Sequence, residues 1–218
     1  MRRISLLPAR RLTAESAVAQ LYNRAAHGWQ AGLDRIGYDA AYRALCAAAQ
    51  DHASPDSPVH VLDVGTGTGV MARAFAANTP QPCQFDLLDI SAEMLQRAQV
   101  SGQPRLIEGA IGTPDIAADS YDRVLCGHVI EHCADPDAAL RWLHARLKPG
   151  GSAILSVSKP HWCTALVRWK YGSSAYTPER VETMLQTAGF TNIHRQPYAS
   201  GPPGRLSCGY IAQRPIDH

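Results

Sequence analysis

The sequence lacks a strong excess of either charge, since 21 Lys and Arg residues stand against 19 Asp and Glu residues in 218. Nucleic-acid-binding domains usually carry a marked basic bias, so this balance argues against that class. The sequence also has no internal repeat and no low-complexity segment. Repeat architectures and compositionally disordered chains are therefore not expected.

The six cysteines form no Cys-x-x-Cys pair and show no clustering. Zinc sites and disulfide frameworks usually reveal themselves through closely spaced cysteines. We therefore expect no metal and no disulfide framework, and reduced thiols in a cytoplasmic protein. The six positions are Cys46, Cys83, Cys126, Cys133, Cys163 and Cys208.

No run approaches the about 18 to 20 apolar residues that are needed to cross a bilayer. The N-terminal segment MRRISLLPARRLTAESAVAQL carries four arginines and no acidic residue before Glu15. We expect an ordinary solvated N-terminal segment here, with peripheral membrane contact as the alternative. The apolar run at residues 4–7 is too short for a secretory signal, and Pro8 interrupts any helix there.

Apolar residues make up 45% of the chain, which is enough for the core of one well-filled domain. Short apolar stretches alternate with helical patterns, which predicts βαβ units and a mostly parallel sheet that is covered on both faces. The expected strands are 59–64, 84–88, 105–108, 121–126, 152–158, 191–198 and 208–213, and the expected helices are 13–27, 34–50, 70–78, 91–99, 135–147 and 178–188.

Three glycines at alternate positions follow the first expected strand, in the stretch VLDVGTGTGV. A dinucleotide fingerprint would need a glycine at position 70, where Val70 stands. A phosphate-binding loop of the Walker type would need a lysine after the glycines, and none follows. The turn therefore suits a ligand without a pyrophosphate.

Two further segments follow at regular spacing, FDLLDISAEMLQRAQ and DSYDRVLCGHVIEHCADPDAALRWLHARLKPGG. With the glycine turn, they resemble the class I S-adenosylmethionine-dependent methyltransferases, above all the type 11 branch that contains the quinone-biosynthesis enzymes. The resemblance covers about residues 59–158 and continues through the closing helix and strands. It implies a doubly wound, seven-stranded, mostly parallel Rossmann-like sheet, and S-adenosyl-L-methionine as the cofactor.

The resemblance also implies a division of one domain, residues 1–218, into four parts. These are N-terminal lid helices at 1–52, a cofactor-binding core at 59–158, a substrate-lid insertion at 159–178, and a closing helix and strand pair at 179–218.

The glycine turn and two acidic residues are the expected cofactor site. Gly65, Gly67 and Gly69 let the backbone approach a ligand without a Cβ clash. Asp89 follows Gly65 by 24 residues, close to the separation expected of a ribose-binding acid on the neighbouring strand. Its carboxylate can accept hydrogen bonds from both ribose hydroxyls. Through the resemblance, Asp63 would hold the turn and the cofactor's amino group.

The adenine contact is harder to assign. Ile90 and Met94 would flank the ring, or they pack into the core. The family often has an acid after the glycine that follows the third strand, but Ala110 stands in that place. The remaining candidates for this contact are the backbone of Ala110 and Ile111 and the carboxylates of Glu108 and Asp115.

The stretch CGHVIEHC ends the fourth expected strand, where the methyl acceptor approaches in this architecture. His128 is our first candidate for a general base or substrate ligand, with a histidine hydrogen-bonded within the loop as the alternative. His132 matches a histidine that is frequent in the family, which implies a structural or positioning role. A metal site of His128, His132 and Cys133 would lack a fourth ligand.

Residues 159–178, KPHWCTALVRWKYGSSAYTP, form a longer connection than usual, which indicates a lid or binding loop. Its aromatic residues would suit an apolar or planar acceptor, or a cationic amine. Alternatively, a short helix places its tryptophans in the core. The candidate substrate residues are His161, Trp162, Trp169 and Tyr176, beside Arg168, Lys170 and Tyr171, and the stretch YNRAAHGW adds Tyr22, His27 and Trp29.

These features predict a methyltransferase acting on a small aromatic, apolar or amine molecule. A membrane-associated enzyme acting on lipid headgroups is the alternative within the enzymes. A non-catalytic binding or regulatory subunit is the alternative of another class. The presence of Gly65, Gly67 and Asp89 argues against that last alternative, because a protein that had lost its cofactor need not keep them.

Overall fold

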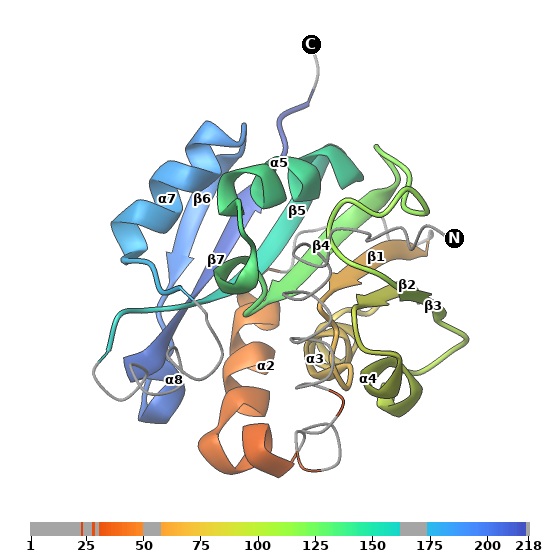
Figure 1. The fold of residues 1–218 in the computed structure, drawn as a ribbon, viewed down its shortest axis with the longest axis horizontal. Coiled ribbons are helices and arrows are strands. Elements are labelled where there is room, and N and C mark those ends of the chain that lie inside the picture. The colour runs from red at the N-terminus through yellow and green to blue at the C-terminus, as the bar shows by residue number, and fades with distance from the viewer. Residues whose placement is uncertain (1–22, 24–27, 29–30, 50–57, 162–173, 217–218) are drawn as a thin grey trace, which may run out of the picture.

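A computed structural model of the chain describes residues 23, 28, 31–49, 58–161 and 174–216. Its strands form one seven-stranded sheet in the order β3-β2-β1-β4-β5-β7-β6 (Figure 1). Strand β7 alone runs in the direction opposite to the other six strands. This confirms the predicted mostly parallel sheet. The strands are β1 (Val59–Val64), β2 (Cys83–Asp89), β3 (Arg105–Glu108), β4 (Tyr121–Gly127), β5 (Leu147–Ser158), β6 (Thr191–Gln196) and β7 (Ser207–Gln213).

The helices connect the parallel strands, and several begin at the capping residues that their sequences predict. Ser91 accepts a hydrogen bond from the Met94 amide, and Asp135 accepts one from the Ala138 amide. Residues 31–36 are also helical. The helices are α2 (Tyr38–Ala48), α3 (Val70–Asn78), α4 (Ala92–Arg97), the 3-10 helix η1 (Ile130–His132), α5 (Pro136–Arg146), α7 (Pro178–Thr187) and α8 (Gly201–Leu206).

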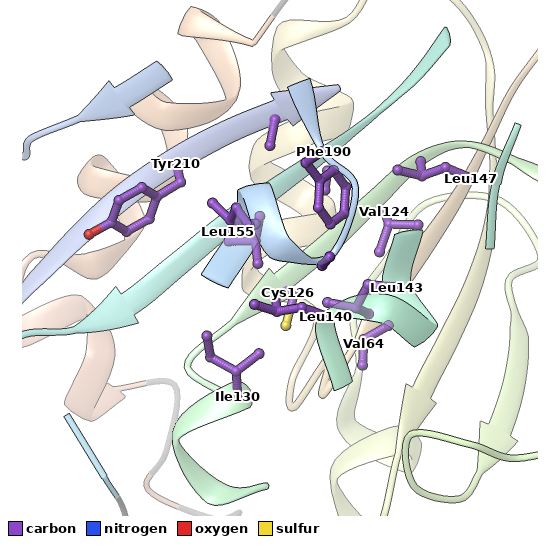
Figure 2. Close-up of a cluster of buried hydrophobic side chains, with 14 of the residues drawn as sticks. Val64, Val124, Cys126, Ile130, Leu140, Leu143, Leu147, Leu155, Phe190 and Tyr210 are labelled. Carbon is purple, nitrogen blue, oxygen red and sulfur yellow. The ribbon is translucent and has the colours of Figure 1, made fainter. Parts of the chain in front are cut away.

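Two hydrophobic clusters cover the two faces of the sheet, because successive strand residues point to opposite sides. On β4, Val124 and Cys126 belong to the cluster under α5 and α7, which Figure 2 shows. Leu125, between them, belongs to the cluster under α2 and α3. Both clusters are almost free of solvent exposure, so the sheet is a rigid base for the loops at its edge.

The start of β5 differs from the prediction. The preceding helix ends at Arg146, close to the expected residue 147, but the strand was expected to begin only at residue 152, after the segment KPGG. Instead, Leu147 already pairs with Tyr121, and the register shifts before Arg123 pairs with Ser152. Gly150 takes a left-handed φ of 81° in this irregular stretch. The glycines therefore form a bulge within the strand.

The segment between β6 and β7 also differs. The strand that was predicted over 191–198 ends at Gln196, and the proline-rich stretch GPPGRL forms the short helix α8. Proline is well tolerated in the first turn of a helix, where its missing N–H is not needed. Among the helices that the structure describes, none combines the length and the apolar character that a membrane crossing requires.

Gly209 on β7 offers a test of the packing between the sheet and α2. A Cβ at this position would lie 2.7 Å from Leu45 Cδ1 and 3.0 Å from the Gln196 carbonyl oxygen. We expect Gly209→Ala to lower the free energy of unfolding by about 1 to 3 kcal/mol, because the core is overpacked. Urea denaturation measures this.

Gly109→Ala is the matched control, since its Cβ would meet its nearest neighbour at an ordinary 3.5 Å. It should change the free energy of unfolding by less than about 1 kcal/mol. Equal effects of the two substitutions would contradict the described packing of Leu45 on β7.

Candidate active site

The order of the sheet reverses between β1 and β4, which lie side by side although β2 and β3 separate them in sequence. Ligands of doubly wound folds bind at the carboxyl ends of the strands near such a switch point. The loops after β1, β2 and β4 meet at this edge (Figure 1). They carry the glycine turn, Asp89 and His128, which the sequence had singled out separately.

The three glycines of the turn all have left-handed backbone angles, with φ of 63°, 54° and 79° at Gly65, Gly67 and Gly69. Side chains rarely tolerate this conformation. A Cβ at Gly65 would also lie 2.2 Å from Val129 Cγ2, and one at Gly69 would lie 2.8 Å from Val100 Cγ2. The turn therefore requires glycine for its own conformation and packing, in addition to any close approach of a ligand.

Asp63 lies at the end of β1, only 1% exposed. Its Oδ2 accepts a hydrogen bond of 2.7 Å from the Thr66 hydroxyl. Burial raises the pKa of Asp63 to about 7, against the hydrogen bonds from Thr66 and the Ala72 amide. Asp63 is thus hydrogen-bonded to Thr66 of the turn, while its contact with a cofactor's amino group stays a prediction.

Asp89 joins the end of β2 to the glycine turn. Its Oδ2 accepts from the Gly67 amide at 2.8 Å, and its Oδ1 accepts from the Ser91 amide at 2.9 Å. Burial raises the pKa of Asp89, against these backbone hydrogen bonds. A carboxylate has about four lone-pair positions. The Ile90 amide is a third backbone donor to this carboxylate, so about one acceptor position remains for a ligand hydroxyl.

Ser91 connects this site to the N-terminal segment. Its hydroxyl caps α4 and also bonds to Oδ1 of Asn23. Asn23 belongs to the stretch YNRAAHGW, whose residues Tyr22, His27 and Trp29 are the predicted substrate residues, and it was not itself predicted. The one feature of the sequence that pointed to Asn23 was its position within the stretch YNRAAHGW.

The residues expected at the adenine differ in exposure. Met94 is 1% exposed and packs as a core residue, whereas Ile90, Ala110 and Ile111 stay partly exposed. Ile111 also packs against the cluster under α5 and α7. Glu108 and Asp115, the alternative contacts, are exposed. All of these adenine assignments stay predictions.

His128 follows β4 directly and has a φ of 59°, which is rare for a residue other than glycine. Its amide donates to the Ser156 carbonyl at 2.8 Å. Such strained residues persist only where the surrounding structure holds them, and they cluster at functional sites. The conformation supports a functional position for His128 without defining its role.

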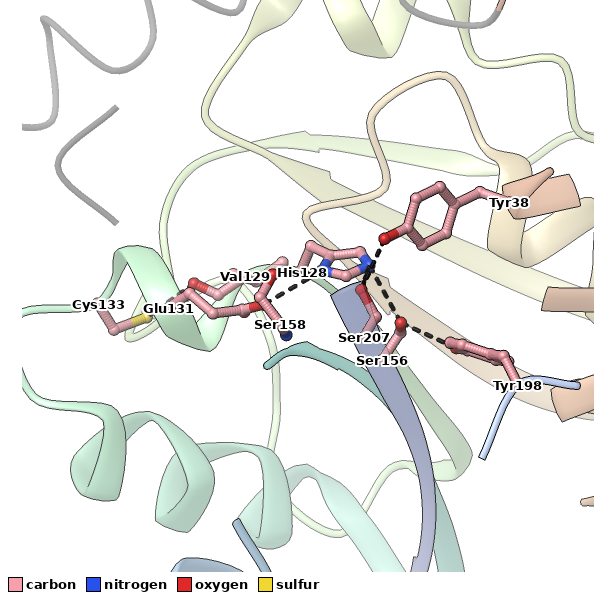
Figure 3. Close-up of polar contacts among 9 residues, drawn as sticks. All are labelled: Tyr38, His128, Val129, Glu131, Cys133, Ser156, Ser158, Tyr198 and Ser207. Atoms are coloured by element: carbon pink, nitrogen blue, oxygen red, sulfur yellow. Dashed lines mark hydrogen bonds and ion pairs between the residues drawn. The ribbon is translucent and has the colours of Figure 1, made fainter. Parts of the chain in front are cut away.

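Both ring nitrogens of His128 have hydrogen-bonding partners (Figure 3). Nδ1 lies 3.2 Å from Glu131 Oε1 and 3.1 Å from Ser158 Oγ. Nε2 lies 3.1 Å from Ser156 Oγ and 3.5 Å from Ser207 Oγ. The ring is thus hydrogen-bonded within the protein, and with 23% of its side chain exposed it also reaches the surface of the site.

Two tyrosines extend this network. The Tyr38 hydroxyl lies 2.6 Å from Ser207 Oγ, and the Tyr198 hydroxyl donates to Ser156 Oγ at 2.8 Å. The ring of Tyr38 meets His128 edge to face, with 5.1 Å between the centroids. None of these four residues was singled out from the sequence, because nothing distinguishes them from core residues of α2, of the strands or of the segment after β6.

Glu131 in η1 was also missed as a site residue. It is 2% exposed, and its Oε1 accepts from the Ser158 amide at 2.6 Å. Burial alone would raise the pKa of Glu131, but the hydrogen bonds from His128 and Ser158 outweigh it and hold the pKa below its ordinary value. A buried carboxylate therefore stays ionised beside His128.

His132, the second histidine, lies in η1 beside Glu131. Burial lowers its pKa, partly offset by the charge of Glu131. The thiol of Cys133 bonds to the Val129 carbonyl at 3.6 Å. Within the described part of the chain, no group of three His, Cys, Asp or Glu side chains could hold a metal ion.

Two of the predicted substrate residues can be placed. Tyr176 donates its amide to the Ser158 carbonyl at 3.0 Å and packs partly against the core, and His161 is partly exposed after β5. The remainder lie outside the described residues, so their roles stay predictions: Tyr22, His27, Trp29, Trp162, Arg168, Trp169, Lys170 and Tyr171.

A family model described as a methyltransferase domain matches residues 38–195. A ubiquinone biosynthesis O-methyltransferase from Leptothrix cholodnii is 36% identical over 100 residues, which cover 44% of this chain and 43% of that protein. The chain thus matches less than half the length of this curated relative.

Solved structures share the fold at low identity. A chain from the complex between a methyltransferase activator and a methyltransferase of Haloferax volcanii has a TM-score of 0.73 at 19% identity, covering 92% of this chain and 99% of that one. The 1,6-didemethyltoxoflavin-N1-methyltransferase of Burkholderia thailandensis, bound to its substrate and S-adenosylhomocysteine, has a TM-score of 0.65 at 21% identity, covering 98% and 93%.

The buried carboxyl of Asp63 predicts a pH dependence of stability. Its folded pKa of about 7 lies above the ordinary value near 4. Between these values the folded state binds the proton that the unfolded state has lost, so stability falls as pH rises from about 4 to about 7. Asp63→Asn removes this dependence. The free energy of unfolding of the wild type, relative to this variant, should fall by a few kcal/mol over that range.

Urea denaturation at several pH values measures the difference. Asp115→Asn, at an exposed position, controls for the change in net charge. A wild-type-minus-variant difference that stays flat from pH 4 to pH 7 would show that Asp63 is ionised throughout in the folded state.

Proposed function

The chain belongs to the methyltransferase domain family, and we propose that it transfers a methyl group from S-adenosyl-L-methionine to a small molecule. The observation that carries the proposal is the hydrogen bond of 2.8 Å between the Gly67 amide and Asp89. It places a left-handed glycine turn and a carboxylate together at the switch point of the sheet.

The residues present fit this cofactor. The glycine turn exposes backbone rather than side chains, and Asp89 keeps acceptor capacity for a ribose hydroxyl. Asp89 lies beside the turn, and Asp63 lies beneath it with a pKa that burial raises to about 7, so a nearby positive charge would favour the ionised form of both carboxyls. Such a site disfavours a pyrophosphate and favours a cationic ligand. When bound, the cofactor supplies an activated methyl group on a positively charged sulfur.

The protein's own task is then to align the acceptor and exclude water. His128 lies at the end of β4 with part of its ring exposed, and it acts on the acceptor as hydrogen-bond partner or base. The L. cholodnii relative is named for O-methylation and the B. thailandensis structure for N-methylation. The acceptor here is accordingly a small molecule with an oxygen or nitrogen nucleophile, aromatic, apolar or amine in character.

We further propose that the protein is cytoplasmic, and that residues 1–52 and 159–178 enclose the acceptor over the core at 59–158, with the closing elements at 179–218. A peripheral membrane contact through the N-terminal arginines stays an alternative, testable by liposome co-sedimentation with and without residues 1–11. Equal, negligible binding by both forms would remove it.

Asp89→Ala tests the cofactor site. Loss of charge-assisted hydrogen bonding to the ribose should weaken binding of S-adenosylhomocysteine by about 1.5 to 3 kcal/mol, or roughly 10- to 150-fold. Equilibrium dialysis measures the affinity. Asp137→Ala, which removes an exposed carboxylate on α5, is the control and should bind like the wild type. Unchanged affinity in Asp89→Ala would refute the ribose assignment.

His128→Ala tests the acceptor side. A screen of small hydroxyl and amine compounds with methyl-labelled cofactor first identifies an acceptor. Turnover of that acceptor should then fall about 100-fold or more in His128→Ala, the scale of general base catalysis, while the affinity for S-adenosylhomocysteine changes less than 3-fold. Full turnover in the variant would show that His128 only stabilises the loop and does not act on the acceptor. A wild type that binds no cofactor would instead favour a non-catalytic subunit.

A further inference from the structure

We propose that Glu131 is a positioning residue that holds His128 in the tautomer with its proton on Nδ1, which leaves Nε2 as the basic nitrogen of the site. The proposed function supplies only the consequence for methyl transfer. The tautomer itself follows from the contacts of the two residues and can be measured without any substrate.

The contact at Nδ1 decides the tautomer. Glu131 Oε1 lies 3.2 Å from Nδ1, and an ionised carboxylate can accept a hydrogen bond but not donate one. The contact is attractive only if Nδ1 carries the hydrogen. With the proton on Nε2 instead, a lone pair of Nδ1 would point at a carboxylate oxygen in a buried site, where such repulsion is poorly screened.

Ser158 holds Glu131 in place but does not itself select the tautomer. Its amide donates to the same Oε1 at 2.6 Å, which fixes this oxygen at the end of β5. Its hydroxyl, 3.1 Å from Nδ1, can donate or accept and so is compatible with either tautomer. The selection therefore rests on Glu131.

The groups around Nε2 are consistent with this assignment. The hydroxyl of Ser156 at 3.1 Å, or that of Ser207 at 3.5 Å, can donate to the single lone pair of an unprotonated Nε2. The Tyr198 hydroxyl donates to Ser156 in turn, and Tyr38 bonds to Ser207. The contacts in Figure 3 therefore allow a hydroxyl to donate to Nε2 while Nδ1 donates to Glu131.

The arrangement suits an acceptor whose nucleophilic atom carries a proton. When a hydroxyl or N–H acceptor gains a methyl group, its O–H or N–H bond breaks and the proton must be taken up. Nε2 takes this proton, and the imidazolium that forms is balanced by the ionised Glu131 until the proton passes to water. Glu131 therefore acts through His128, without touching the acceptor.

Long-range ¹H–¹⁵N correlation spectra of the labelled full chain identify the tautomer, with His128→Gln to assign the ring signals. We expect the wild type at pH 8 to show the hydrogen on Nδ1. A wild-type ring with its hydrogen on Nε2 would overturn the proposal, and this result needs no variant that perturbs the fold.

Glu131→Ala and Ser158→Ala form a matched pair, since each removes one partner of Nδ1. The Nε2–H form should become the major one in Glu131→Ala, while Ser158→Ala should keep the proton on Nδ1. Retention of the Nδ1–H form in a folded Glu131→Ala would overturn the role of Glu131.

Binding of S-adenosylhomocysteine to the same wild-type sample separates this inference from the proposed function. Cofactor binding together with the Nε2–H tautomer would overturn the inference and leave the proposed function standing. The Nδ1–H tautomer without cofactor binding would support the inference and contradict the proposed function.

Discussion

The hydrogen bond between the Gly67 amide and the Asp89 carboxylate is the contact on which the candidate site depends. It joins the loop after β1 to the end of β2, and the hydrogen bond from the Thr66 amide to the Leu88 carbonyl supports it. A bond to a charged acceptor contributes more than a neutral one. Because the turn is held in this way, its left-handed glycines present backbone at the switch point of the sheet.

Buried carboxylates give both ends of the site their chemical character. Asp63 and Asp89 lie under the cofactor end, and Glu131 lies behind His128 at the acceptor end. Burying such groups is costly unless hydrogen bonds compensate, and each of the three accepts at least one. The site thus combines negative charge with restricted water, which suits a positively charged methyl donor and a reaction that releases a proton.

The sequence predicted the sheet, and it placed the glycine turn and Asp89 at the ends of neighbouring strands, because both depend on short-range patterns. The alternation of strands and helices, and the spacing from Gly65 to Asp89, can be counted along the chain. The acceptor end depends on long-range contacts instead. Tyr38 and Ser207 are 169 residues apart, and a serine in a strand looks the same whether or not it bonds to a histidine. The bulge at the start of β5 was missed because KPGG also suits a helix end.

Titration calorimetry of the wild-type chain tests the central claim most directly, using S-adenosylhomocysteine and, in parallel, a pyrophosphate-containing dinucleotide such as NAD. A left-handed glycine turn bonded to Asp89, with Asp63 beneath it, predicts saturable one-site binding of S-adenosylhomocysteine and no measurable binding of NAD. No heat with S-adenosylhomocysteine, or equal binding of both compounds, would contradict the account.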